Sequence, residues 1–199
     1  IIIAYFVDVW ISKNLKNSNR FAEKEYPTWN DIYEGKVNSD LLIFGSSRAW
    51  IHIDPTMISD SLGISSYNLG IDGHNFWLQN LRYRELLKHN KRPKFIIFSL
   101  DYFTLKKNKD LYNSEQFLPY MLWNQEVKEA TISYNGFSST DYEIPLIRYY
   151  GNYDAVETYT KMYQKSTLFI KTGVNSGVHW TKCRKIFLEF GPGVISGVD

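Results

Sequence analysis

The sequence of 199 residues predicts a three-layer α/β domain, in which helices flank a parallel sheet. Three observations predict this fold class. Short strand-like runs recur along residues 40–100, each run ends in small or polar residues, and a helical segment separates the last two. The composition agrees, because 44% hydrophobic and 22% charged residues are typical of one folded domain and exclude intrinsic disorder.

The chain opens on an apolar run, IIIAYFVDVWI, which only Asp8 interrupts and which Lys13 and Lys16 follow. A helix that spans a membrane needs about 20 apolar residues. We therefore expect residues 1–11 to be the remnant of a transmembrane helix, with a buried strand or helix of a soluble fold as the alternative. The other end, GPGVISGVD, has no final helix, so a chain truncated at both ends is expected.

Changes in the spacing of apolar residues along the chain predict the remaining elements. Polar residues with scattered aromatics predict a tether or short helix over 12–38, which leads into a domain over 39–199. Strands are predicted at 40–45, 65–70 and 95–100, the first of them buried on both faces. A helix is predicted at 74–90, which holds no Gly or Pro and whose apolar positions do not alternate, and two helical pieces are predicted within 104–165.

Composition and spacing exclude several functional classes. A net charge of +2 argues against a nucleic-acid binder, and Cys183, the only cysteine, excludes a disulfide framework. No Walker motif and no zinc-ligand spacing occur, so we expect no nucleotide, no metal and no cofactor. The segment Arg148–Tyr153, which holds three tyrosines, is interpreted as packed aromatics, with a sugar-stacking shelf as the alternative. The basic run 88–94 is interpreted as a solvated helix end, with an anionic surface as its alternative partner.

Each predicted strand ends in a cluster that could carry chemistry. The clusters are Gly45-Ser46-Ser47-Arg48, then residues 68–74 (NLGIDGH), then Ser99-Leu100-Asp101-Tyr102. In open α/β sheets ligands bind at the carboxyl ends of the strands, so we expect the three clusters to converge on one crevice.

Each cluster also has a structural interpretation. Ser46 and Ser47 either cap a helix or place a nucleophilic hydroxyl beside backbone N–H groups, and the G-x-S-x-G pattern is not met because Ala49 stands at its last position. The glycines at 70 and 73 either make a turn or allow a substrate to approach the backbone closely. Asp101 either caps the next turn, orients a histidine or binds a substrate hydroxyl.

The order of these blocks resembles the SGNH (GDSL-like) hydrolase superfamily, and its membrane-anchored bacterial branch that includes proteins of cell-surface polymer acylation. The resemblance covers residues 40–102. It implies an SGNH or flavodoxin-like fold, Ser47 as the nucleophile, and Gly73 as an oxyanion-hole donor. Ser46, Asn68, His74 and Asp101 are then oxyanion or substrate-binding candidates, although Asp101 stands where the family has an asparagine donor.

The family's last block, Asp-x-x-His, supplies the general base. His179 is the histidine that matches it, and Ser176 stands where the family has Asp. His179 is therefore either the base or an unrelated histidine, with the true block lost beyond residue 199. His74 is the alternative base, whereas His52 and His89 are interpreted as surface or local-structure residues.

The resemblance implies a serine esterase or O-acyltransferase that acts on acyl esters of a surface glycan or other acylated polymer. Such a protein would be held by an N-terminal membrane anchor at the extracytoplasmic face of a bacterial cell envelope. The alternative is a catalytically inactive module of the same fold that binds a glycan or a partner enzyme.

Overall fold

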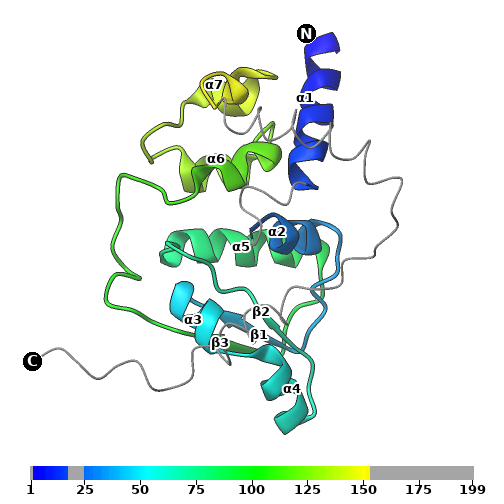
Figure 1. Ribbon diagram of the computed structural model, residues 1–199, viewed down its shortest axis with the longest axis vertical. Coiled ribbons are helices and arrows are strands. Elements are labelled where there is room, and N and C mark those ends of the chain that lie inside the picture. Colours follow the sequence, from blue (N-terminus) through cyan, green and yellow to red (C-terminus); the bar gives the residue numbers. More distant parts are fainter. Residues whose placement is uncertain (1, 18–24, 153–199) are drawn as a thin grey trace, which may run out of the picture. The chain divides into compact units, whose positions relative to one another are not determined.

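The predicted parallel sheet is present in the computed structural model, which describes residues 2–17 and 25–152, all of them in one compact unit (Figure 1). Its strands are β1 (Leu41–Phe44), β2 (Ser66–Asn68) and β3 (Phe95–Phe98). The order is β2-β1-β3, and β1 pairs in parallel with both neighbours. The protein is therefore a mixed α/β protein with a small parallel sheet, as the pattern of short runs predicted.

Helices precede, connect and follow these strands in the described ranges. The α-helices are α1 (Ile2–Lys16), α2 (Glu25–Tyr33), α3 (Ser47–His52), α4 (Pro55–Leu62), α5 (Phe76–His89), α6 (Gln125–Thr131) and α7 (Ser139–Glu143). Two 3₁₀ helices are η1 (Ser114–Tyr120) and η2 (Ile147–Tyr149). The helix predicted at 74–90 is thus confirmed as α5, which begins after the cap Asn75, and α6 and α7 lie in the stretch where two helical pieces were predicted.

Helices cover the two faces of β1. Leu42 and Phe44 belong to the larger core, which the apolar side chains of α2 and α5 complete. Ile43 points to the other face, where it packs in a second core with Ala49 of α3 and Ile58 of α4. Successive residues of a strand point to opposite faces, so a run buried throughout requires cover on both sides. The burial of the whole of β1 agrees with its uninterrupted apolar sequence.

Helix α2 belongs to the core. Its Tyr26, Trp29 and Ile32 are fully buried, and Trp29 lies edge-on against Phe117 of η1. Leu15 of α1 joins the same core. Within the segment 12–38, for which a tether or a short helix was expected, Leu15 and α2 therefore belong to the core.

Strand β3 is more exposed than its apolar sequence suggests. It was predicted as a strand on its apolar run, yet Phe95, Ile96 and Ile97 are 57%, 45% and 39% exposed. The reason is that no helix of the described ranges packs extensively against β3, whose main contacts are with β1. An edge strand with few helices against it leaves apolar side chains uncovered.

Helix α1 forms where the apolar N-terminal run was found. It extends through Ile2–Lys16, and the described ranges contain no helix that is both long enough and apolar enough to cross a membrane. Figure 1 shows α1 beside the helices that follow the sheet in sequence, and its contacts are mainly with η1.

Candidate functional site

The ends of the three strands lie side by side, as the sequence predicted. The amide of Ser99, which follows β3, donates to the carbonyl of Phe44 at 2.8 Å. On the other side of β1, the amide of Ile71 donates to the carbonyl of Gly45 at 3.1 Å. These bonds extend the ladder past the last residues of the strands, so the three polar clusters share one edge of the sheet.

Two glycines let helix α3 sit directly on this edge. A Cβ on Gly45 would lie 2.5 Å from the Cβ of Ala49 and 2.8 Å from that of Ser99. A Cβ on Gly70 would lie 2.6 Å from the backbone nitrogen of Trp50. All three distances are shorter than real Cβ contacts, so any side chain at either position would push α3 away from the strands.

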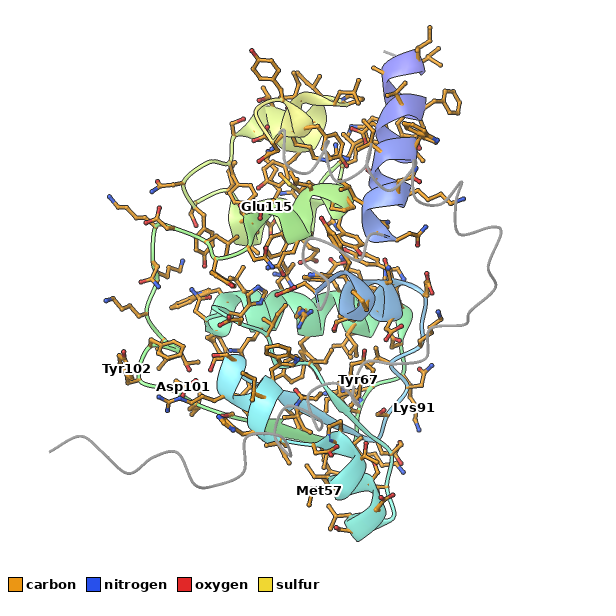
Figure 2. All side chains as sticks on the ribbon, viewed as in Figure 1. Met57, Tyr67, Lys91, Asp101, Tyr102 and Glu115 are labelled. Atoms are coloured by element: carbon orange, nitrogen blue, oxygen red, sulfur yellow. The ribbon has the colours of Figure 1, made fainter. Side chains whose placement is uncertain are left out.

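Ser46 is the cap of α3 and is fully buried. Its hydroxyl accepts from the amide of Arg48 at 3.4 Å and donates to the carboxylate of Asp101. Arg48 also forms an ion pair with Asp101, at 3.0 Å. Asp101 lies beside the start of α3 (Figure 2), and its side chain is only 2% exposed whereas that of Arg48 is 65% exposed. The predicted capping role of Ser46 is therefore observed, and Asp101 is the acceptor that holds it.

Ser47 differs from Ser46 in its exposure and in its hydrogen bonding. It is the first residue of α3 and is half-exposed. Its hydroxyl forms no hydrogen bond with the residues that the structure describes. Ser47 is thus half-buried and unbonded within the described residues, while the Ser46 hydroxyl both accepts and donates a hydrogen bond. The structure therefore assigns the capping role, which the sequence left open between the two serines, to Ser46.

Asn68 is the last residue of β2, and Gly73 lies in the loop that follows the strand. The side-chain amide of Asn68 donates to the carbonyls of Ala49 and Ile53 at 2.8 and 2.7 Å, and its oxygen accepts from the amide of Gly70 at 2.8 Å. Both N–H donors of Asn68 are thus used to hold the last turn of α3. Gly73 is exposed, in a left-handed conformation with φ 68° that favours glycine.

His74 was the alternative base and a substrate-binding candidate, and the structure places it inside the protein instead. It is fully buried, and its ring stacks on Phe117 with centroids 6.0 Å apart. Burial, with a further contribution from the Arg82 cation, holds the pKa of His74 well below its usual value. A neutral ring without exposed atoms is a core residue, and a substrate at the sheet edge does not reach it.

The remaining candidates have different outcomes. His179, with Tyr153 and Cys183, lies outside the described residues. Arg148 and Tyr149 are buried, as packed aromatics require, while Tyr150 is 83% exposed. The described ranges contain no cluster of three or more His, Cys, Asp or Glu side chains that could hold a metal ion.

The sequence did not predict the roles of two charged residues. Arg48 was named only as part of its cluster, yet it pairs with Asp101. Asp8 was treated as an interruption of an apolar run, yet it binds Arg148 in the interior. A lone charge inside an apolar run is the signal that could have identified it, since such a charge requires a partner.

The chain matches no model of a known protein family, no curated protein sequence and no solved structure.

Proposed function

We propose that the protein is an SGNH-like serine esterase or O-acyltransferase that acts on acyl esters of a cell-surface glycan or polymer. The observation that carries the proposal is the contrast at the start of α3: Ser46 is buried and bonded to Asp101, while Ser47 is half-exposed and its hydroxyl has no partner in the described residues. The resemblance of the three blocks to that superfamily gives the same residue the role of nucleophile.

The reaction would begin at the Oγ atom of Ser47. Oγ attacks the acyl carbonyl carbon, its proton passes to a histidine, and the carbonyl oxygen becomes an oxyanion. The backbone N–H groups of Ser47 and Gly73 are the donors that the resemblance provides for this oxyanion. When the intermediate collapses, the ester C–O bond breaks and the leaving alcohol takes the proton, which leaves an acyl-enzyme on Ser47.

The second half of the reaction determines the product. Water that attacks the acyl-enzyme makes the protein an esterase, and a sugar hydroxyl makes it an acyltransferase. In both cases the histidine accepts the proton of the attacking hydroxyl, and Ser47 is regenerated. We assign the base to His179, because His74 is buried and its pKa is lowered.

Asp101 favours a second candidate function. A carboxylate paired with Ser46 and Arg48 accepts hydrogen bonds and does not donate them, whereas the family's asparagine donates. A module with this edge would bind the hydroxyl groups of a glycan, or a partner enzyme, without turning over an ester. This alternative requires binding without covalent chemistry.

The test is labelling with a fluorophosphonate, followed by intact mass and peptide mapping. We expect one adduct on Ser47 in the 199-residue chain, no adduct in Ser47→Ala, and an unchanged adduct in the control Ser61→Ala, which alters an exposed serine of α4. His179→Ala should slow labelling strongly if it is the base. A folded chain that takes no label and turns over no acyl ester contradicts the enzyme, and glycan binding by that chain would favour the second candidate.

A further inference from the structure

Helix α1 turns its polar side inward and its apolar side outward. Asp8 and Ser12 are 1% and 8% exposed, while Ile3 and Phe6 are 80% and 65% exposed. An ordinary surface helix has the opposite arrangement. A helix with this arrangement is expected where the surroundings of the protein are less polar than its interior contacts.

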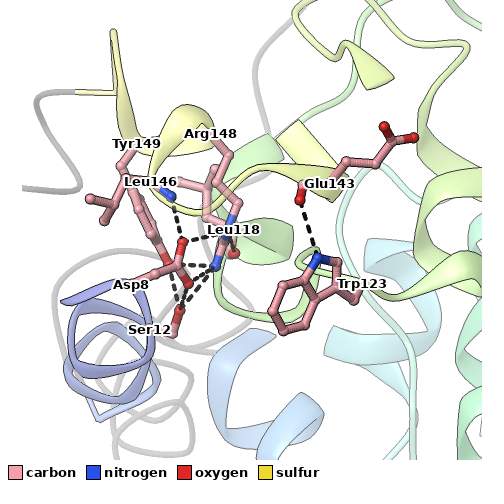
Figure 3. Close-up of polar contacts among 8 residues, drawn as sticks. All are labelled: Asp8, Ser12, Leu118, Trp123, Glu143, Leu146, Arg148 and Tyr149. Carbon is pink, nitrogen blue, oxygen red and sulfur yellow. Dashed lines mark hydrogen bonds and ion pairs between the residues drawn. The ribbon is translucent and has the colours of Figure 1, made fainter. Parts of the chain in front are cut away.

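A network of hydrogen bonds holds the polar side in place (Figure 3). The guanidinium of Arg148 donates to the two oxygens of Asp8 at 2.7 and 2.6 Å, and the amide of Leu146 donates to Asp8 at 2.7 Å. Ser12 shares a hydrogen bond of 2.7 Å with the hydroxyl of Tyr149. These four hydrogen bonds therefore fix α1 in one rotational setting against the segment 146–149.

The apolar side continues onto a neighbouring turn. Tyr5 stacks on Trp123, with ring centroids 5.1 Å apart and planes inclined by 16°. Trp123 is 62% exposed, and its indole N–H donates to the carbonyl of Glu143 at 3.1 Å. We define the apolar α1 surface as its exposed members: Ile2, Ile3, Phe6, Val9, Trp10 and Trp123.

The distribution of charged residues along α1 bears on what covers this surface. Asp8 is the one charged residue within Ile2–Ile11, and it is buried, so three turns of α1 present no charge to their surroundings. Lys13 is the first exposed charge along the helix. Uncharged apolar side chains bordered by Trp, Tyr and Lys are typical of the interface of a lipid bilayer. A soluble protein partner would instead be expected to meet charged or polar groups at the rim of such a surface.

The place of Trp123 in the fold bears on the mode of binding. Trp123 lies on a different segment and contacts α1 through Tyr5. This contact favours a surface that lies against the bilayer together with the domain.

We propose that the apolar α1 surface inserts into the interface of a phospholipid bilayer and holds the domain against it in a fixed orientation. This inference rests on the membrane attachment that the proposed function includes, and it adds that the folded domain itself, through Trp123, touches the lipid. A flexible tether would bring only α1 to the bilayer.

The experiment uses the 199-residue chain and neutral phosphatidylcholine vesicles, so that added charge has no direct effect on attraction. We expect the chain to sediment with the vesicles, and Phe6→Glu and Trp123→Glu each to weaken binding by about tenfold to a hundredfold, as the loss of one large buried apolar side chain does. The matched control is Met57→Glu on α4, where Met57 is 68% exposed. It should bind like the unaltered chain.

Quenching by brominated lipid distinguishes a held domain from a tethered one. Trp10→Phe and Trp123→Phe should each remove part of the quenched tryptophan emission, whereas Trp77→Phe, at the start of α5, should not. If Trp10→Phe removes quenched emission and Trp123→Phe does not, the domain is not held against the bilayer. Equal vesicle binding by Phe6→Glu and Met57→Glu would overturn the surface, as would a dimer in solution that Phe6→Glu dissociates.

Fluorophosphonate labelling of Ser47 in the same samples separates this inference from the proposed function. A chain that is labelled but does not bind vesicles contradicts only the bilayer surface. A chain that binds vesicles through α1 and Trp123 but is not labelled contradicts only the esterase.

Discussion

Replacing Asp8 by Ala tests whether α1 is held by its buried ion pair. The substitution removes the acceptor of four hydrogen bonds: two from the Arg148 guanidinium, one from the Leu146 amide and a longer one, of 3.4 Å, from the Ser12 hydroxyl. Arg148 keeps the carbonyl of Leu118 and the hydroxyls of Ser12 and Tyr149. Its charge, on a residue 2% exposed, would have no counter-ion left among the described residues. Breaking a buried pair in this way costs about 3–5 kcal/mol.

The free energy of unfolding of each variant should be measured by urea titration, followed by far-UV circular dichroism. A matched control is Asp54→Ala, which removes an exposed carboxylate bond of 2.8 Å to the amide of Thr56 at the start of α4. Loss of a helix cap of this kind costs about 1 kcal/mol. We therefore expect Asp8→Ala to lower the free energy of unfolding several times more than Asp54→Ala does.

A double variant separates the charge from the packing. Asp8→Leu with Arg148→Met leaves no uncompensated charge in the interior, so it should be more stable than Asp8→Ala although it lacks both partners. If Asp8→Ala costs no more than Asp54→Ala, the ion pair does not hold α1, and the reasoning about the orientation of that helix fails with it.

Two further predictions concern the sheet edge and the core. Asp101→Ala should lower the free energy of unfolding by about 1–3 kcal/mol, because the buried Ser46 hydroxyl loses its acceptor. Arg48→Ala removes an exposed partner of Asp101 and should lower it by less than about 1 kcal/mol. Urea titration of both variants measures the difference. Burial lowers the pKa of His74 in the folded protein, so its contribution to stability is complete above the unfolded pKa of about 6.5 and is lost as the pH falls below it, by up to about 1.4 kcal/mol per pH unit. His74→Leu should flatten this dependence between about pH 6.5 and 5.5, which urea titrations across that range would measure.

The sequence was sufficient for the elements whose pattern is local. The apolar run of β1 and the unbroken segment of α5 each carry their own signal, and parallel pairing follows from a helix between strands. The exposure of β3 was not predictable, because it depends on which helices pack against the strand and not on the apolar residues of β3 itself. The role of α2 was hidden for a similar reason, since Trp29 meets Phe117 across 88 positions of the chain.

The candidate site, too, could be predicted from the sequence only in part. That Ser46 and Ser47 follow a strand was visible in the sequence, but which hydroxyl is buried depends on the position of Asp101, which folding brings to the start of α3. His74 stood beside a glycine at a strand end, which suggested a cleft, and the turn at Gly73 directs it into the core instead. Side-chain direction after a turn depends on backbone angles that a sequence pattern does not specify.

The ion pair between Asp8 and Arg148 joins residues that are 140 positions apart. When α1 leaves the ribosome, its carboxylate lacks the partner that it has in the fold, because η2 has not yet been synthesised. An α1 peptide by itself would therefore bring an exposed carboxylate to the bilayer that we propose, at a free-energy cost. Only the completed fold hides that charge, so under this proposal the chain would acquire affinity for lipid at the end of folding and lose it whenever the segment 146–149 detaches.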